Sequence, residues 1–349
     1  MSRPAHLEPS KLGTREYWDA LYTTEIANHA HDPTDTGTTW FDDSDAEAKL
    51  LEFLEDPERA QELGLDTATT SFLDLGTGNG ALLFALRDAG WGGPMLGVDY
   101  SAQSVRFARR IERTRRRLLS DKIEGEDEGD GNGKEESVKK EKGEEEDIQG
   151  GDEEIDAEVD VHFAEFDILR NSAAALLEAR YSPSVREGWD VVLDKGTFDA
   201  ISLSAETLLD NNNNNNGDAA AAAPQPRRVN EAYGTRILPL VREGGVFLIT
   251  SCNWTEAELR SWFEGDGAVQ EIPTITSAIT STSTSTSTST STSVTITSNG
   301  AGEGQQQQQQ HEYWGFEVVG RVEYRSFSFG GVKGQTISSL CFRKVRKSR

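Results

Sequence analysis

An acid and a base follow an apolar run in the stretch WDVVLDKGTFDAI, residues 189–201. The apolar residues 191–193 predict a buried strand, and Asp194 and Lys195 stand where that strand ends. A carboxylate there, or the backbone carbonyl of the same residue, can hold an amine in line with a reaction partner. We therefore predict that Asp194 clamps a substrate, with capping of the next helix as the alternative. Lys195 is expected to turn away into a surface ion pair, and Thr197 to cap the helix.

A glycine-rich loop, LDLGTGNG, connects another apolar run to a helical pattern. Gly76, Gly78 and Gly80 allow the chain to turn and a ligand to approach the backbone. Their G-x-G-x-G spacing is tighter than the G-x-G-x-x-G of dinucleotide sites. A tight turn without a ligand is the alternative.

Acidic residues mark three successive predicted strands. Asp99 ends the second strand, where a carboxylate can accept both hydrogens of a ribose diol, and Asp74 lies inside the first. A charge inside a strand is costly unless loop amides or a ligand's ammonium group satisfy it. Asp167 is predicted to receive an adenine amino group, with Phe166 and Ile168 close to the ring. These residues predict a cofactor with an adenosine and an ammonium group; a nicotinamide dinucleotide is the rival.

Elements that could position these residues alternate along the chain. Apolar runs at 71–80, 94–100, 159–169, 189–201 and 244–253 are separated by helical patterns, which predicts a parallel sheet with helices on both faces. Two further strands, 314–327 and 336–345, follow each other without a helix and suit a hairpin. The sequence thus predicts an α/β fold, and this order of elements resembles the Rossmann-like fold of class I methyltransferases. Its seven-strand sheet is parallel except for a C-terminal β-hairpin.

Low-complexity segments interrupt this pattern. Residues 121–160 hold 19 acidic residues and five lysines, and tracts of Asn, Ser-Thr and Gln occur further on. Such tracts lack the apolar side chains that offset ordering entropy, so we expect disordered insertions. The chain is predicted to be a single domain, 1–349, interrupted near 121–158, 210–228 and 274–311.

Charge and hydropathy exclude some classes of partner. The net charge of −25 argues against a nucleic-acid binder, which needs a basic face. No apolar run approaches the roughly 20 residues that span a bilayer, and the N-terminus lacks the apolar core of a signal peptide. We expect no membrane contact and a cytoplasmic location, with the nucleus possible because of the basic tail RKVRKSR.

The cysteines and paired histidines are expected to carry no chemistry. Cys252 and Cys341 lie in apolar runs, which predicts two buried free thiols in a reducing compartment. His29 and His31 have no further ligands at metal-binding spacing, so we interpret them as loop polarity and predict no metal.

The motifs LDLGTGNG, GVDYS, FDIL and LDKGTFDAI together resemble the seven-strand S-adenosylmethionine-dependent protein-lysine methyltransferases. The similarity is strongest to the branch that methylates translation elongation factor 1-alpha, and it extends to both ends of the chain. Only the insertions depart from it.

The resemblance implies S-adenosylmethionine as cofactor and a lysine of elongation factor 1-alpha as substrate. Asp194 would position that lysine, and Trp40 would close over the cofactor beyond an N-terminal helix that packs Tyr17, Trp18 and Leu21 on the sheet. The predicted cofactor-binding residues are Trp40, Asp74, Gly76, Gly78, Asn79, Gly80, Asp99, Tyr100, Phe166, Asp167 and Asp194.

Two other functions remain open at this point. A small-molecule methyltransferase would usually carry a lid of packed helices, which the polar insertions are not. A non-catalytic adaptor that retains the fold would not need the glycine loop together with Asp99. We expect a monomer that acts on a protein substrate.

Overall fold

The computed structural model describes residues 3–127, 160–178, 187–208, 227–264, 269–271, 312–329 and 332–348. The predicted insertions lie largely outside these ranges. Two of their edges do not, because α5 (Ala102–Asp127) continues to residue 127 and β6 (Arg227–Arg228) pairs with β5 (Thr207–Leu208). Regular structure therefore extends further toward the insertions than composition predicted.

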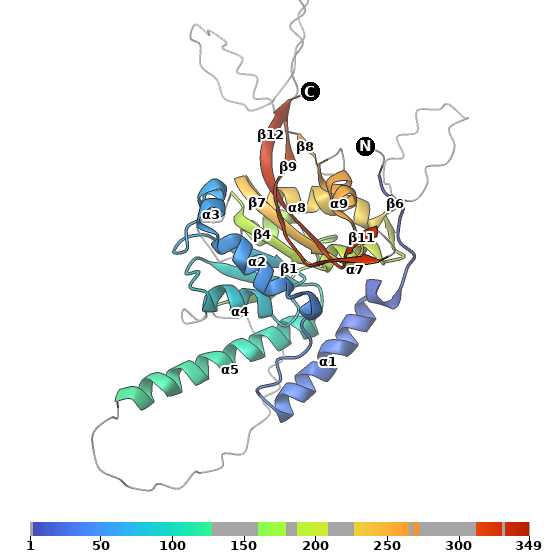
Figure 1. The fold of residues 1–349 in the computed structure, drawn as a ribbon. Helices are drawn as coiled ribbons and strands as arrows, with labels where there is room; N and C mark the ends of the chain where they lie inside the picture. The colour runs from blue at the N-terminus through green and yellow to red at the C-terminus, as the bar shows by residue number, and fades with distance from the viewer. Residues whose placement is uncertain are drawn as a thin grey trace, which may run out of the picture.

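A single mixed sheet forms the centre of the described chain, with the strand order β3-β2-β1-β4-β7-β12-β9-β8 (Figure 1). The strands are β1 (Phe72–Leu75), β2 (Met95–Asp99), β3 (His162–Glu165), β4 (Trp189–Lys195), β7 (Val241–Ser251), β8 (Gln270–Glu271), β9 (Glu312–Val322) and β12 (Ser338–Ser348). The first five in this order pair in parallel. The predicted seven-strand fold is confirmed, and the short β8 adds an eighth strand at one edge.

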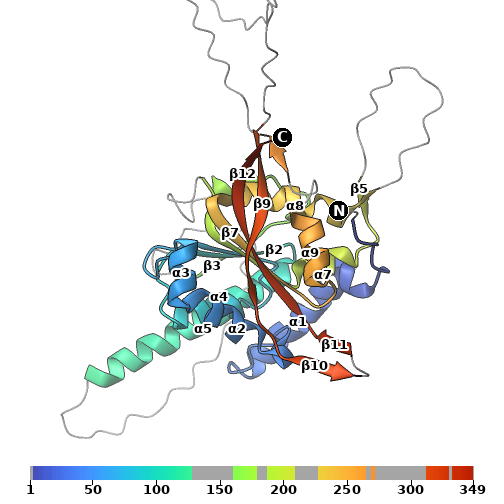
Figure 2. The ribbon, with the colours of Figure 1, turned by 45° about the horizontal axis from the view of Figure 1, so that its top comes forward.

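The two C-terminal strands pair antiparallel, as the predicted hairpin requires. β12 runs antiparallel to both β7 and β9, so β9 has the same direction as the parallel strands. Only β12 and β8 oppose the rest of the sheet. The connection between β9 and β12 forms a second ribbon, β10 (Ser326–Phe329) with β11 (Val332–Gln335), which Figure 2 shows at one end of the pair.

Helices cover both faces of the sheet, as the alternation predicted. One face carries α2 (Ala46–Glu55), α3 (Pro57–Leu63), α4 (Ala81–Asp88) and α5, and the other carries α6 (Ala173–Leu177), α7 (Thr197–Ser202), α8 (Tyr233–Ile237) and α9 (Glu256–Phe263). Each face has its own apolar core, with Leu193 pointing into the first and Val192 into the second. In the described ranges we find no helix with the length and apolarity that a bilayer span requires.

The N-terminal helix α1 (Arg15–His31) packs along α5 (Figure 1). The ring of Tyr22 lies 6.4 Å from that of Phe107 on α5, and both are buried. The side predicted to pack on the sheet is only partly buried; it consists of Tyr17, Trp18 and Leu21. Trp18 does pack against the apolar core of the first face, to which Tyr22 belongs, but the helix as a whole lies along α5.

The paired histidines lie in α1, so their interpretation as loop residues is wrong. His29 is buried, its Nδ1 lies 2.8 Å from the carbonyl oxygen of Asp35, and its ring packs on Phe107. Cys341 is buried in the sheet, as predicted.

Candidate functional site

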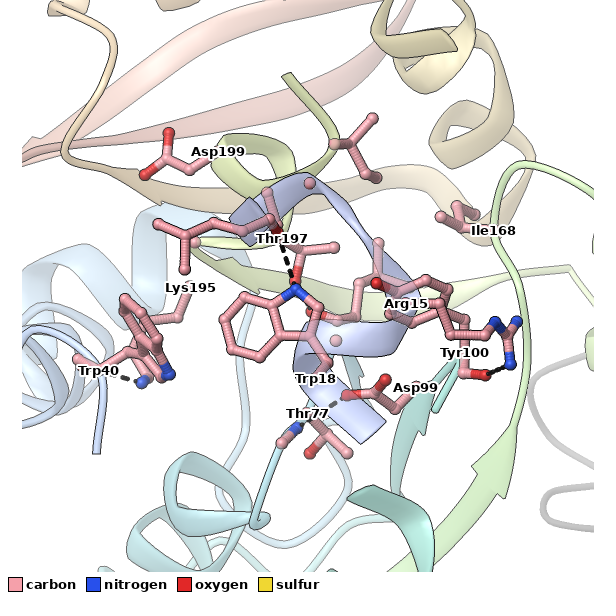
Figure 3. A pocket seen from close by; sticks show the side chains of 18 of the residues that line it. Arg15, Trp18, Trp40, Thr77, Asp99, Tyr100, Ile168, Lys195, Thr197 and Asp199 are labelled. Carbon is pink, nitrogen blue, oxygen red and sulfur yellow. Dashed lines mark hydrogen bonds between the residues drawn. The ribbon is translucent and has the colours of Figure 1, made fainter. Parts of the chain in front are cut away.

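A pocket of about 610 Å³ opens at the carboxyl ends of β1, β2 and β4. Other walls come from the start of α1, from the segment that leads into α2, and from the residues that follow β3, β4 and β7. Figure 3 shows Trp18 in the middle of the pocket, with Trp40 and Lys195 on one side and Arg15 and Tyr100 on the other. The pocket therefore has two ends, and they differ in chemistry.

The glycine loop forms one wall, and its neighbours explain why glycine is required. Gly76 and Gly78 have φ of 65° and 60°. A Cβ on Gly76 would lie 2.0 Å from Thr197 Oγ1, and one on Gly78 would lie 2.7 Å from the Tyr22 hydroxyl. Both glycines line the pocket, as predicted. Their backbone turns where a side chain has neither room nor a relaxed conformation.

The next two residues of the loop have different positions. Asn79 lines the pocket and donates from its side chain to the carbonyl of Thr36, 2.9 Å away, which ties the loop to the N-terminal segment. Gly80 begins α4 with φ of 81°, and a Cβ there would lie 2.6 Å from the Phe163 ring. Gly80 does not line the pocket; it lies against the Phe163 ring, and its contact with the cofactor stays a prediction.

Asp99 lies at one end of the pocket with its carboxylate held by three donors. The backbone N–H groups of Gly78 and Ser101 donate to it over 3.2 and 2.9 Å, and the Ser104 hydroxyl over 2.8 Å. Burial raises the pKa of this carboxyl, and these hydrogen bonds oppose that shift. Two carboxylate oxygens provide about four acceptor positions, so about one remains, on Oδ1, for a ribose hydroxyl.

Asp167 and Phe166 line the same end of the pocket. The Asp167 carboxylate accepts from the backbone N–H of Leu169 at 3.0 Å and from the Arg170 guanidinium at 2.7 Å. Ile168 also lies at this end (Figure 3). An apolar wall beside a fixed acceptor is the arrangement predicted for an adenine ring.

Arg15 is a residue of this end that the sequence analysis did not identify. Its guanidinium lies 4.6 Å from the centre of the Tyr100 ring and 3.7 Å from the Asp167 carboxylate, and it donates to the Tyr100 carbonyl. Arg15 is far from these residues in sequence, and no spacing pattern links them. Only the packing of α1 brings it to the pocket.

Asp74 lies deeper, beneath the glycine loop, and it also lines the pocket. Burial raises the pKa of its carboxyl to about 7, with nearby Lys195 opposing the shift and Glu47 and Asp99 adding to it. A cation bound beside Asp74 would favour its ionised form. The position agrees with the predicted contact to an ammonium group.

Asp194 has a different role from the one predicted. Its carboxylate is 1% exposed and does not line the pocket. It accepts from the N–H groups of Thr197 and Phe198, at 2.8 and 3.1 Å, and from the Tyr233 hydroxyl at 2.6 Å. In this structure the side chain does not reach the pocket, and the helix-cap alternative describes its contacts. A contact through its backbone carbonyl remains a prediction.

The residues after Asp194 also differ from expectation. Gly196, with φ of 94°, begins α7, and Thr197 uses its hydroxyl on the Leu75 carbonyl at 2.6 Å instead of capping the helix. Lys195 is not on the surface. It lines the pocket, donates to the Trp40 carbonyl at 3.1 Å and lies 3.2 Å from Glu47 Oε1.

The wall beside Lys195 includes Phe41, Cys252 and Asn253. Phe41 has φ of 64°, an uncommon value for a residue with a side chain, and its ring lies against Gly196. Cys252 is exposed, so the prediction of two buried thiols is wrong for this one. Partial burial and then the Asp199 carboxylate raise the pKa of its thiol to about 12, which keeps it protonated and unreactive.

The charges of the pocket suit a cationic ligand. Carboxylates outnumber cations in the lining, which contains Glu16, Glu47, Asp74, Asp99, Asp167, Asp199 and Glu206 against Arg15, Arg170 and Lys195. The indole N–H of Trp40 is buried without a hydrogen-bond partner among the described residues. A ligand with a positive centre, a ribose, an adenine ring and an acceptor group would match these features, and S-adenosylmethionine has all of them.

Comparisons with known proteins also indicate a methyltransferase. The family model described as "Methyltransferase domain" matches residues 66–122, which hold the glycine loop and Asp99. The chain is 33% identical to protein-lysine N-methyltransferase EFM4 of Saccharomyces cerevisiae, over 76% of this chain and 86% of that protein. It is also 33% identical to efm4 of Schizosaccharomyces pombe, over 75% and 84% of the two chains. Human EEF1A lysine methyltransferase 2 is 28% identical over 76% and 79%.

Fold and pocket thus define a class I methyltransferase that uses S-adenosylmethionine. Within that class, the chain belongs to the family of protein-lysine N-methyltransferases that includes EFM4 and EEF1A lysine methyltransferase 2. The resemblance seen in the sequence motifs is confirmed.

Proposed function

We propose that this chain transfers a methyl group from S-adenosylmethionine to a lysine side chain of translation elongation factor 1-alpha. Support for the substrate comes from the relatives, because those from zebrafish, human and mouse are named EEF1A lysine methyltransferase 2. Support for the chemistry comes from one observation. The acids predicted for the cofactor, Asp74, Asp99 and Asp167, line a single pocket at the ends of adjacent strands.

Each part of the cofactor has a group of residues suited to it. Asp99 would accept a ribose hydroxyl, Asp167 the adenine amino group, and Phe166 would pack on the ring. Gly76 and Gly78 would lie along the chain that joins the ribose to the amino-acid end. When bound, S-adenosylmethionine supplies an electrophilic methyl group on a positively charged sulfur.

The acceptor lysine must lose a proton before it can react. With a pKa of about 10.4, roughly 0.04% of a free lysine is neutral at pH 7. Trp18, Trp40 and Phe41 line the pocket and exclude water, and desolvation favours the neutral amine.

The proposal is tested by transfer of a labelled methyl group to purified elongation factor 1-alpha, followed by mass spectrometry of the modified peptide. We expect one labelled lysine, and we expect arginine at that position to abolish labelling because guanidinium stays protonated. Asp99→Ala is the control for a lost cofactor site. Labelling of another protein in a cell extract, with the factor untouched, would overturn the substrate.

The alternative functions give different results in the same experiment. An adaptor that retains the fold would label no protein. A small-molecule methyltransferase would bind S-adenosylhomocysteine yet transfer label only to a low-molecular-weight fraction of the extract. Either result would replace the proposed function.

A further inference from the structure

Two polar atoms in the pocket wall beside Lys195 have no hydrogen-bond partner among the described residues. They are the indole nitrogen of Trp40, a donor, and Oε1 of Glu47, an acceptor, and both are buried. Buried polar atoms are nearly always paired, so an unpaired donor and acceptor in one wall indicate a missing partner with both functions.

Lys195 connects these residues. Its Nζ donates to the Trp40 carbonyl at 3.1 Å and lies 3.2 Å from Glu47 Oε1, at ion-pair distance but without hydrogen-bond geometry. The side chains of Lys195 and Glu47 are 13% and 20% exposed. An ammonium has three N–H groups, and the hydrogen bond to Trp40 uses one. A cation and an anion thus stand side by side, each with capacity for a further partner.

This group lies at the opposite end of the pocket from the adenosine residues. The strand order puts β4, which ends in Lys195, two strands from β2, which ends in Asp99. Two strand spacings are about 10 Å. Figure 3 shows Lys195 and Trp40 on the far side of Trp18 from Asp99 and Tyr100. A cofactor with its ribose at Asp99 would extend its other end toward Lys195.

We propose that Glu47, Lys195 and the Trp40 N–H form the subsite for the amino-acid end of the cofactor. Lys195 and the indole N–H bind the carboxylate, and Glu47 accepts from the α-ammonium alongside Asp74, which lines the same pocket. A zwitterion laid antiparallel to a Glu–Lys pair satisfies both charges and both unpaired atoms. The inference rests on the proposed function, since it concerns the same cofactor.

The test compares two ligands that differ only at this end. S-adenosylhomocysteine has the α-ammonium and the carboxylate, whereas methylthioadenosine has the same adenosine and thioether without them. Calorimetry on the full chain measures both affinities for the wild type, Glu47→Gln and Lys195→Met. We expect S-adenosylhomocysteine to bind about 10- to 100-fold more weakly to each variant, as for a lost charge-assisted hydrogen bond. Methylthioadenosine is expected to change less than about twofold.

A matched control lies on the same helix as Glu47. Lys49 and Glu52 form an exposed ion pair on α2, so Lys49→Met and Glu52→Gln remove equivalent charges away from the pocket. Both controls are expected to bind both ligands like the wild type. Melting curves of all variants show whether the fold is retained.

Two outcomes would overturn the inference. Equal weakening of both ligands would mean that the pair only supports the pocket wall, and unchanged binding of S-adenosylhomocysteine would mean that the subsite lies elsewhere. Neither outcome affects the proposed function if the wild type still methylates its substrate. A wild-type chain that binds neither ligand would overturn the proposed function, and this inference with it.

Discussion

Asp99 and Asp194 occupy similar places in the sequence and different places in the molecule. Each lies at the end of an apolar strand of the parallel part of the sheet, shortly before a helix. The Asp99 carboxylate lines the pocket and holds the glycine loop through the Gly78 N–H. The Asp194 carboxylate is closed off by the start of α7 and by Tyr233.

The difference arises from the register of β4. Asp194 pairs with Leu75, and Leu193 pairs with Asp74. Partners in adjacent strands point to the same face, and successive residues alternate between faces. Asp194 therefore points into the core under α7 and α8, while Lys195 shares the face of Asp74. A position at the end of a strand is therefore not enough to place a side chain near a ligand. The face of the sheet to which the side chain points must be known as well.

The largest effect is expected from truncation of Asp194. Asp194→Ala leaves two buried N–H groups and the Tyr233 hydroxyl without their acceptor, which should lower the free energy of unfolding by about 3 kcal/mol. Urea unfolding monitored by circular dichroism measures it. Asp194→Asn retains an acceptor oxygen and should lose about half as much. An Ala variant as stable as the wild type would mean that these contacts are absent in solution.

Truncation of Asp99 should act mainly on the cofactor. Asp99→Ala removes the ribose acceptor and the support of the Gly78 N–H, and we expect affinity for S-adenosylhomocysteine to fall about 100-fold, or about 2.7 kcal/mol. Asp194→Asn, measured by the same calorimetry, should stay within about threefold of the wild type. A larger loss of affinity in Asp194→Asn than in Asp99→Ala would mean that Asp194, and not Asp99, contacts the cofactor.

The pH dependence of stability gives a further test of the buried Asp194. Burial raises the pKa of Asp194 to about 7 in the folded chain, against 3.8 for an exposed carboxyl. Between these values the folded state holds a proton that the unfolded state has lost, so stability falls as the pH rises from about 4 to about 7. Asp194→Asn should remove up to about 1.4 kcal/mol per pH unit from that slope. Part of the slope should remain in this variant, because burial also raises the pKa of Asp74 to about 7. An unchanged slope would contradict the assignment.

The smallest effect is expected for Tyr233→Phe. The change removes only the hydroxyl that donates to Asp194 over 2.6 Å, while the ring remains stacked on Phe198. We expect a loss of about 1 kcal/mol in the free energy of unfolding, with cofactor affinity unchanged. A loss of cofactor affinity without a loss of stability would place Tyr233 in the pocket after all.

The sheet and one end of the pocket could be predicted from sequence because local patterns determine them. Apolar runs, glycines and strand-end acids were sufficient for β1 to β4 and for Asp74, Asp99 and Asp167. The other end was not predictable in this way. Glu47 on α2 and Arg15 on α1 reach the pocket through long-range packing, for which the sequence has no periodic signal. The direction of Lys195 depended on a register that only strand pairing determines.

The most direct test of this account is the rate of methyl transfer by Asp194→Asn, at saturating cofactor and at a temperature where the variant remains folded. If the carboxylate only holds α7 in place, the rate per folded molecule should stay within about fivefold of the wild type, a difference under about 1 kcal/mol in the barrier. A loss of 100-fold or more in the folded variant would contradict it. The Asp194 carboxylate would then contact the reacting amine, and the division of roles between the two faces of β4 would be wrong.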